Sequence, residues 1–148
     1  QILEAALGGA SAILLIAAAL DERTLRRLMA TARDIGITVL AEVHNDFELD
    51  RALGAGADVI GVNNRNLKTL TVDLGVCERI VEHIPTDVVA IAESGLRSAS
   101  DLIGLSKAGY DAFLIGESFL VTPEPGATLA GLLSKFERCS VETLDANR

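Results

Sequence analysis

The sequence predicts an α/β fold in which five parallel strands alternate with helices. Short apolar runs of strand length recur at intervals of roughly 20 to 30 residues, which is the spacing of βα units. Between these runs, apolar residues recur at helical spacing. Neither a linker nor a low-complexity segment interrupts the alternation. We therefore predict one domain over residues 1–139, followed by a polar tail over residues 140–148.

Five apolar runs are interpreted as strands because small or turn-forming residues bound them and both of their faces read as buried. These strands are expected over residues 12–16, 38–43, 58–62, 88–92 and 112–115. Six helices are expected. A crossover helix over residues 1–7 precedes the first strand, and the others begin near Asp21, near Asn45 or Asp46, at Asp73, at Ser98 and after Pro125. The tail from Ser140 onward has no pattern, so no regular structure is expected there.

Length bears on which α/β architecture is present. An eight-stranded barrel typically takes about 250 residues, whereas an open parallel sheet fits a chain of this size, so length alone favours the open sheet. The chain begins with Gln1 rather than a methionine and enters a predicted helix at once. This start suggests a fragment of a longer protein.

Composition excludes several classes of function. A net charge of −8 and a pI of about 4.7 argue against a surface that binds nucleic acid or anionic lipid. The longest apolar stretch, residues 10–20, is too short to span a bilayer, so a cytoplasmic protein is expected. Cys77 and Cys139 lie in predicted helices without metal-binding spacing and are expected to be reduced. His44 and His83 are assigned no role.

Polar residues at the ends of the middle strands are the candidates for chemistry, because sites in parallel sheets and barrels lie beyond the carboxyl ends of the strands. Glu42 interrupts an apolar strand and could be a general acid or base, or simply a solvated loop carboxylate. Asn63, Asn64 and Arg65 follow the next strand. They offer amides and a guanidinium for a carboxylate or phosphate, although asparagines are also common in turns.

Small residues end the last two strands, as Ser94-Gly95 and as Gly116-Glu117-Ser118. Small residues allow backbone N–H groups to approach an anion at a helix N-terminus, and the loops after the last two strands of a barrel commonly bind phosphate. Two such loops on consecutive units therefore favour phosphate binding over plain turns.

Four motifs, in this order and spacing, resemble the indole-3-glycerol phosphate synthase family. They are Ala41-Glu42-Val43-His44, IGVNNRNL over residues 60–67, Ala92-Glu93-Ser94-Gly95 and FLIGES over residues 113–118. The resemblance runs from Gln1 to about Phe136. It implies the fourth to eighth units of a (βα)8 barrel, and an enzyme of tryptophan biosynthesis. That enzyme closes the indole ring of 1-(2-carboxyphenylamino)-1-deoxyribulose 5-phosphate with loss of carbon dioxide and water, without metal or organic cofactor.

The resemblance also implies roles for individual residues. Glu42 would serve the dehydration step, Asn63 would hold a substrate hydroxyl or the carboxylate-bearing end, and Ser94 would line the pocket. Arg65 and Glu93 would contact the substrate. The phosphate would be bound mainly through backbone amides by Gly95, Gly116 and Glu117, with Ser118 adjacent.

In that family a general-acid lysine precedes the helix that starts here at Gln1, and an earlier strand end adds a glutamate and a lysine. The chain alone is therefore expected to be nearly inactive. Exposed strand edges are expected to cause self-association. The alternative function is a non-catalytic, phosphate-binding half-barrel. A related phosphate-binding isomerase that uses a cysteine and an aspartate is disfavoured, because neither thiol ends a strand.

Overall fold

Strands and helices alternate along residues 1–145, the part of the chain that the computed structural model describes; side chains are described for residues 1–138. The strands are β1 (Ala12–Ile16), β2 (Thr38–Val43), β3 (Val59–Asn63), β4 (Val89–Glu93) and β5 (Ala112–Leu114). The α-helices are α1 (Ile2–Leu7), α2 (Glu22–Asp34), α3 (Asp46–Gly54), α4 (Gly75–Ile80), α5 (Ala99–Ala108), α6 (Glu117–Leu120) and α7 (Pro125–Asp145). Two 3-10 turns, η1 (Ala17–Ala19) and η2 (Val81–His83), complete the elements. All five predicted strands are confirmed to within one residue at each end.

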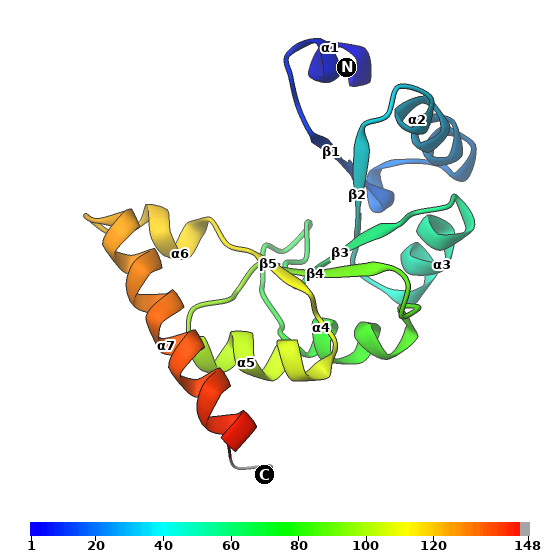
Figure 1. Ribbon diagram of the computed structural model, residues 1–148. Coiled ribbons are helices and arrows are strands. Elements are labelled where there is room, and N and C mark those ends of the chain that lie inside the picture. Colours follow the sequence, from blue (N-terminus) through cyan, green and yellow to red (C-terminus); the bar gives the residue numbers. More distant parts are fainter. Residues whose placement is uncertain (146–148) are drawn as a thin grey trace.

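The five strands form one parallel sheet in the order β1-β2-β3-β4-β5. Each strand therefore pairs with the next one along the chain, as in a (βα)8 barrel, whereas open doubly wound sheets reverse their strand order at a switch point. Figure 1 shows the sheet curving, with helices α2, α3, α4 and α5 along its outer side. The fold is thus a partial barrel, and the preference that length gave to an open sheet is wrong.

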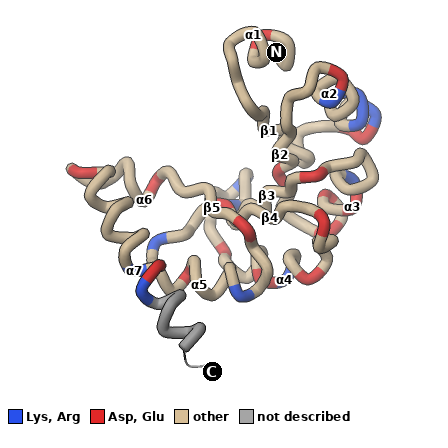
Figure 2. Tube along the Cα trace, in the orientation of Figure 1, with Lys and Arg blue, Asp and Glu red and all other residues tan. Residues whose placement is uncertain are grey.

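The two faces of the sheet differ in how well they are covered. The outer face packs against helices, and its side chains are almost completely buried; they include Ala41, Val43, Ile60, Val62, Ala90 and Ala92. On the inner face, Leu14 of β1 and Leu114 of β5 keep 41% and 52% of their surface exposed. Charged residues lie mainly on helices and loops, while the strands are largely uncharged (Figure 2). The helix-covered face therefore forms a closed hydrophobic core, whereas the inner face leaves apolar side chains of its edge strands exposed.

Three of the six predicted helix starts are confirmed by side-chain caps. The Asp21 carboxylate accepts a hydrogen bond from the Thr24 amide at 2.7 Å, and the Asn45 side chain accepts one from the Glu48 amide at 2.9 Å. Ser98 and Asp101 form a complete capping box at the start of α5. The start predicted at Asp73 is shifted, because its carboxylate accepts from the Gly75 amide at 3.0 Å while Leu74 occupies the cap position.

The C-terminal part of the chain departs from the prediction in two places. Helix α6, four residues long, was not expected, since so short a helix leaves no periodicity in the sequence. Helix α7 continues to Asp145, so the expectation of no regular structure from Ser140 onward is wrong as far as that residue. Residues 146–148 of the predicted tail lie outside the described part of the chain. Among residues 1–145, no helix has both the length and the apolar character that crossing a membrane requires.

Candidate active site

Three polar side chains lie together at the carboxyl ends of β2, β3 and β4. Asn63 and Glu93 are the last residues of their strands and are paired in register, and Glu42 is paired with Gly61. Partners in register share a face, so all three side chains point to the inner side of the sheet. Glu42, Asn63 and Glu93 are nevertheless only 6%, 8% and 3% exposed. Burying two carboxylates side by side costs folding free energy, whereas a single solvated carboxylate costs none. This arrangement therefore favours a functional site over a solvated loop carboxylate at Glu42.

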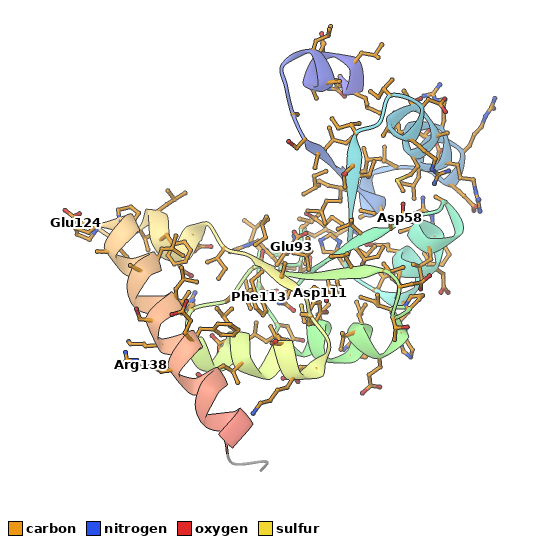
Figure 3. The ribbon with its side chains drawn as sticks, viewed as in Figure 1. Asp58, Glu93, Asp111, Phe113, Glu124 and Arg138 are labelled. Atoms are coloured by element: carbon orange, nitrogen blue, oxygen red, sulfur yellow. The ribbon has the colours of Figure 1, made fainter. Side chains whose placement is uncertain are left out.

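Gly61 makes this arrangement possible. A Cβ atom at this position would lie 1.9 Å from Glu93 Oε1 and 3.0 Å from the Leu40 side chain. The Glu93 side chain therefore crosses the surface of β3, over Gly61, towards Glu42 on the opposite side of that strand. Figure 3 shows Glu93 near the middle of the molecule, where the strands converge. Any side chain at residue 61 would separate the two carboxylates.

The two carboxyl groups affect each other's protonation. The pKa of Glu93 is raised from 4.5 to about 7, first by burial, then by the negative charge of Glu42, and then by a hydrogen bond with Glu42. Two carboxylates that share a buried site cannot both ionise without a large cost. Near neutral pH the pair therefore holds a proton that it can give or take, which is the property of a general acid-base group.

His44 also contacts the Glu42 carboxylate of this pair. Its Nε2 atom lies 3.4 Å from Glu42 Oε1, and its Nδ1 atom lies 3.1 Å from Glu48 Oε2. The prediction gave His44 no role, although its position two residues after Glu42, with an acidic residue four residues later, is a signal that could have found it. Three buried atoms have no hydrogen-bond partner among the described residues: Glu42 Oε1, His44 Nε2 and Glu93 Oε1. A substrate's polar groups could supply these missing partners.

The three asparagines after β3 have different functions. The side-chain oxygen Oδ1 of Asn63 accepts a hydrogen bond from the Arg65 backbone amide at 2.9 Å, which fixes the turn beside the site. Asn64, only 2% exposed, donates to the Glu93 and Ser94 carbonyls and accepts from the Cys77 amide. It joins the end of β3 to β4 and α4 and has a structural role. Asn66 accepts from two following amides in a turn.

A pocket of about 520 Å³ opens beside the carboxylates, and this volume is within the range of small-molecule sites. Its lining comes from the ends of β4 and β5, from α6 and from the loop after β3: Arg65, Glu93, Ser94, Gly95, Leu96, Arg97, Leu114, Ile115, Gly116, Glu117, Ser118 and Val121. Seven of the nine predicted site residues thus line one pocket. Glu42 and Asn63 do not line it and adjoin it through Glu93.

The loop after β4 has an unusual backbone. Ser94 and Gly95 have φ angles of 64° and 78°, in the left-handed region that a non-glycine residue rarely adopts. A Cβ at residue 95 would also lie 2.3 Å from the Val72 side chain. The backbone conformation of this loop therefore requires glycine at residue 95. It also holds Ser94 in a strained conformation at the pocket wall.

Helix N-termini contribute less to this pocket than the sequence suggested. The N-terminus of α5 is closed by Asp101, which accepts from the Arg97 and Ser98 amides at 3.0 and 2.9 Å. The helix that follows Gly116 is the four-residue α6. Any anion here would rely on the Gly95 and Gly116 backbone and on nearby cations.

Two predicted phosphate residues already have partners. The Glu117 carboxylate forms an ion pair with Arg65, and the Ser118 hydroxyl donates to the Leu96 carbonyl at 2.8 Å. Any contact of Glu117 with a phosphate would therefore come from its backbone, and its side chain instead orients Arg65.

Comparison with known proteins shows extensive similarity. The model of the family described as "Indole-3-glycerol phosphate synthase" matches residues 1–132. The chain is 47% identical over 137 residues to indole-3-glycerol phosphate synthase 1 of Streptomyces coelicolor, covering 93% of this chain and 51% of the relative. It is 52% identical over 124 residues to the Chlorobium limicola synthase, covering 84% and 48%. The chain spans about half the length of the curated relatives it matches.

Similar solved structures agree on the fold. A thiamine phosphate pyrophosphorylase from Pyrococcus furiosus superposes with a TM-score of 0.73 at 17% identity, covering 93% of this chain and 65% of that chain. A native KDPGal structure superposes with a TM-score of 0.67 at 19% identity, covering 98% and 65%. At these identities the similarity bears on architecture alone.

Proposed function

Because the chain belongs to the indole-3-glycerol phosphate synthase family, we propose that it supplies the C-terminal five βα units of such an enzyme. The reaction is the ring closure of 1-(2-carboxyphenylamino)-1-deoxyribulose 5-phosphate to indole-3-glycerol phosphate, a carbon–carbon lyase reaction of tryptophan biosynthesis. Carbon dioxide and water are released. The substrate class is thus a phosphorylated small molecule, and binding of nucleic acid or membranes is not expected.

The observation that carries the proposal is the pair of buried carboxyl groups, Glu42 and Glu93, at one rim with a pKa of about 7 for Glu93. Loss of a hydroxyl with removal of a neighbouring proton needs a group that exchanges protons near neutral pH. Glu42 is the proposed catalytic base, and Glu93 contacts the substrate and holds the shared proton beside it.

The neighbouring residues orient the substrate. Asn63 holds a hydroxyl or the carboxylate-bearing end of the substrate from the end of β3, and Arg65 supports that wall through its ion pair with Glu117. Ser94 forms the adjoining wall. Its strained backbone is consistent with a functional position, since strain of this kind concentrates at ligand sites.

The phosphate is proposed to bind at the open end of the pocket through the backbone at Gly95, Gly116 and Glu117, with Ser118 adjacent. Arg97, which also lines this pocket, adds a positive charge that the prediction did not include. The described residues contain no group of three or more His, Cys, Asp or Glu side chains placed to hold a metal ion. A reaction without metal or organic cofactor, and a cytoplasmic location, remain predictions.

The second candidate function is a non-catalytic, self-associating half-barrel. It is favoured by exposed apolar side chains at both edges of the sheet. They are Leu3, Leu7 and Leu14 near β1, and Leu114, Leu120 and Val121 near β5. An unpaired parallel strand with exposed apolar neighbours is a site for pairing with another chain.

One experiment separates the two candidates. The chain is assayed for indole-3-glycerol phosphate formation alone and after mixing with the first half of the Streptomyces coelicolor relative. This chain matches 51% of that relative, and its resemblance to the fourth to eighth barrel units leaves the first half unmatched. Alone, we expect association in light scattering and turnover at least about 10²-fold below that of the mixture, since each positioned acid-base group contributes about 10² to 10⁴ in rate. The same mixture with Glu42→Gln should lose this turnover. If the mixture forms a folded 1:1 complex but shows no turnover, the proposed enzymatic function is refuted.

A further inference from the structure

Glu42, His44 and Glu48 form a line of hydrogen-bonding groups that leads from the carboxylate pair into helix α3. The exposed fractions of their side chains are only 7%, 13% and 12%. His44 stands in the middle, with Nε2 3.4 Å from Glu42 Oε1 and Nδ1 3.1 Å from Glu48 Oε2. The line comes from the end of β2, the loop after it and the first turn of α3.

Glu48 is held in place by hydrogen bonds other than the one to the imidazole ring. One of its oxygens, Oε2, also accepts from the His44 backbone amide at 2.8 Å, and the other accepts from the Asn45 side chain at 2.8 Å. Asn45 in turn caps α3 through the Glu48 amide. The orientation of Glu48 is therefore set by the backbone and the cap, and not by the histidine.

This fixed carboxylate decides which nitrogen of His44 carries hydrogen. Both ring nitrogens face a carboxyl oxygen, but only Nδ1, at 3.1 Å from Glu48 Oε2, has hydrogen-bonding geometry. Because a carboxylate only accepts hydrogen bonds, Nδ1 is the nitrogen that carries the hydrogen in the neutral ring. The other nitrogen, Nε2, then faces Glu42 Oε1. Neither of these two atoms has another hydrogen-bond partner among the described residues.

We propose that His44, oriented by Glu48, is a positioning residue that shares a proton with Glu42 through Nε2. When Glu42 takes a proton from the substrate, that proton passes from Glu42 Oε1 to His44 Nε2. Glu42 returns to the carboxylate form, and the imidazolium donates its two N–H groups to Glu42 and Glu48. The inference deepens the proposed function and rests on it for the identity of the reaction.

The charged groups that face His44 come from two elements, Glu42 on β2 and Glu48 on α3. Glu93 on β4 acts on the line through Glu42. All three are acidic, and each nitrogen of the ring faces a carboxyl oxygen. Glu42 thus has two neighbours with which it can share a proton, Glu93 and His44.

The chain contains a matched control. It has two histidines, and Nδ1 of the second, His83, lies 3.0 Å from Asp46 Oδ1. The His83 and Asp46 side chains are 59% and 53% exposed. This pair has the same chemistry as His44 and Glu48 but is open to solvent. An exposed pair of this kind holds its geometry weakly.

The test follows the ring nitrogens of His44 by long-range ¹H–¹⁵N NMR of the chain labelled in histidine, with His83→Gln used to assign the signals. The neutral His44 ring should carry its hydrogen on Nδ1. Glu48→Ala should move that hydrogen to Nε2 in most molecules, whereas Glu48→Gln, which keeps an acceptor oxygen, should leave it on Nδ1. A hydrogen on Nε2 in the unchanged chain, or no change in Glu48→Ala with an otherwise native amide spectrum, would overturn the proposal.

A second measurement uses the mixture with the N-terminal half of the Streptomyces coelicolor relative. His44→Gln should lower kcat about tenfold or more while KM changes little, as expected for lost proton transfer rather than lost binding. His83→Gln should leave both constants unchanged. An unchanged kcat in His44→Gln would refute proton sharing in catalysis. If the unchanged mixture has no activity at all, the proposed function fails, while the NMR result still decides the hydrogen position.

Discussion

The carboxylate side of the rim, formed by Glu42, His44 and Glu93, is enclosed, while the glycine side, formed by Ser94, Gly95 and Gly116, borders an open pocket. Glu42 and Glu93 are almost completely buried, and atoms of all three residues on the carboxylate side lack hydrogen-bond partners. The glycine side shapes the wall of the 520 Å³ pocket with backbone and small side chains.

This difference suggests a division of tasks. A buried carboxyl pair keeps a proton near neutral pH because burial and like charge oppose ionisation. A charged phosphate, in contrast, must arrive from water and can be held by backbone groups in an open pocket. Arg65 lies between the two sides, since its amide donates to Asn63, the register partner of Glu93, and its guanidinium pairs with Glu117, the residue after Gly116.

Removing the charge of Glu42 should have the largest effect. Glu42→Gln keeps the shape of the side chain, so the reconstituted enzyme should lose about 10² to 10⁴ in kcat with a small change in KM. The pKa of Glu93 should also fall below about 7, because one of the groups that raises it has lost its charge. Steady-state kinetics and ¹³C NMR of the Glu93 carboxyl group measure the two effects. A normal kcat would assign the base elsewhere.

The sequence predicted the strands well because each one is a short apolar run bounded by small, polar or turn-forming residues. Glu42 and Asn63 were found as polar residues at strand ends, since the carboxyl ends of parallel strands share one edge, whereas Glu93 came from the family resemblance. The helical caps at Asp21, Asn45 and Ser98 were also local signals. Features that depend on residues close in sequence could therefore be predicted.

Features that depend on neighbours across strands could not be predicted from the sequence. Gly61 reads as one more small residue in a strand, and only the position of Glu93 above it shows that a Cβ there would force the Glu93 side chain to move. Asn63 and Asn64 are adjacent and chemically identical, yet Asn64 is a structural link because Cys77 and the end of β4 surround it. The ion pair between Arg65 and Glu117 joins residues far apart in the sequence.

The second prediction concerns stability and pH. An acid whose pKa is higher in the folded than in the unfolded state binds its proton more tightly when folded, so the free energy of unfolding falls as pH rises from about 4.5 to about 7. At about 1.4 kcal/mol per pKa unit, Glu93 contributes up to about 3 kcal/mol to this decrease. Glu93→Gln stays neutral at every pH and should remove most of it. Urea unfolding at pH 4.5 and pH 8 is the measurement, and an unchanged decrease would contradict the assignment.

The third prediction tests the glycine side. Gly95→Ala places a side chain at a φ of 78° and 2.3 Å from Val72, so it should lower the free energy of unfolding by about 1–3 kcal/mol. Gly116→Ala is the matched control, because nothing lies within 4 Å of its added Cβ and its φ is negative. It should change stability by less than about 0.5 kcal/mol. Equal losses in the two variants would show that the loop after β4 is not specially constrained.

The smallest effect should come from Ser94→Gly. Glycine adopts the left-handed region without the strain of about 1–2 kcal/mol that a Cβ causes there, but it costs about 0.5–1 kcal/mol in unfolded-state entropy, so a net gain of about 0.5 kcal/mol in unfolding free energy is expected. Leu70→Gly, at a φ of 60° on an exposed loop outside the pocket, should gain a similar amount. Only Ser94→Gly should weaken binding of inorganic phosphate, followed by ³¹P NMR, because the added freedom loosens the pocket wall. Equal phosphate affinity in both variants would mean that the strain at Ser94 is unrelated to binding.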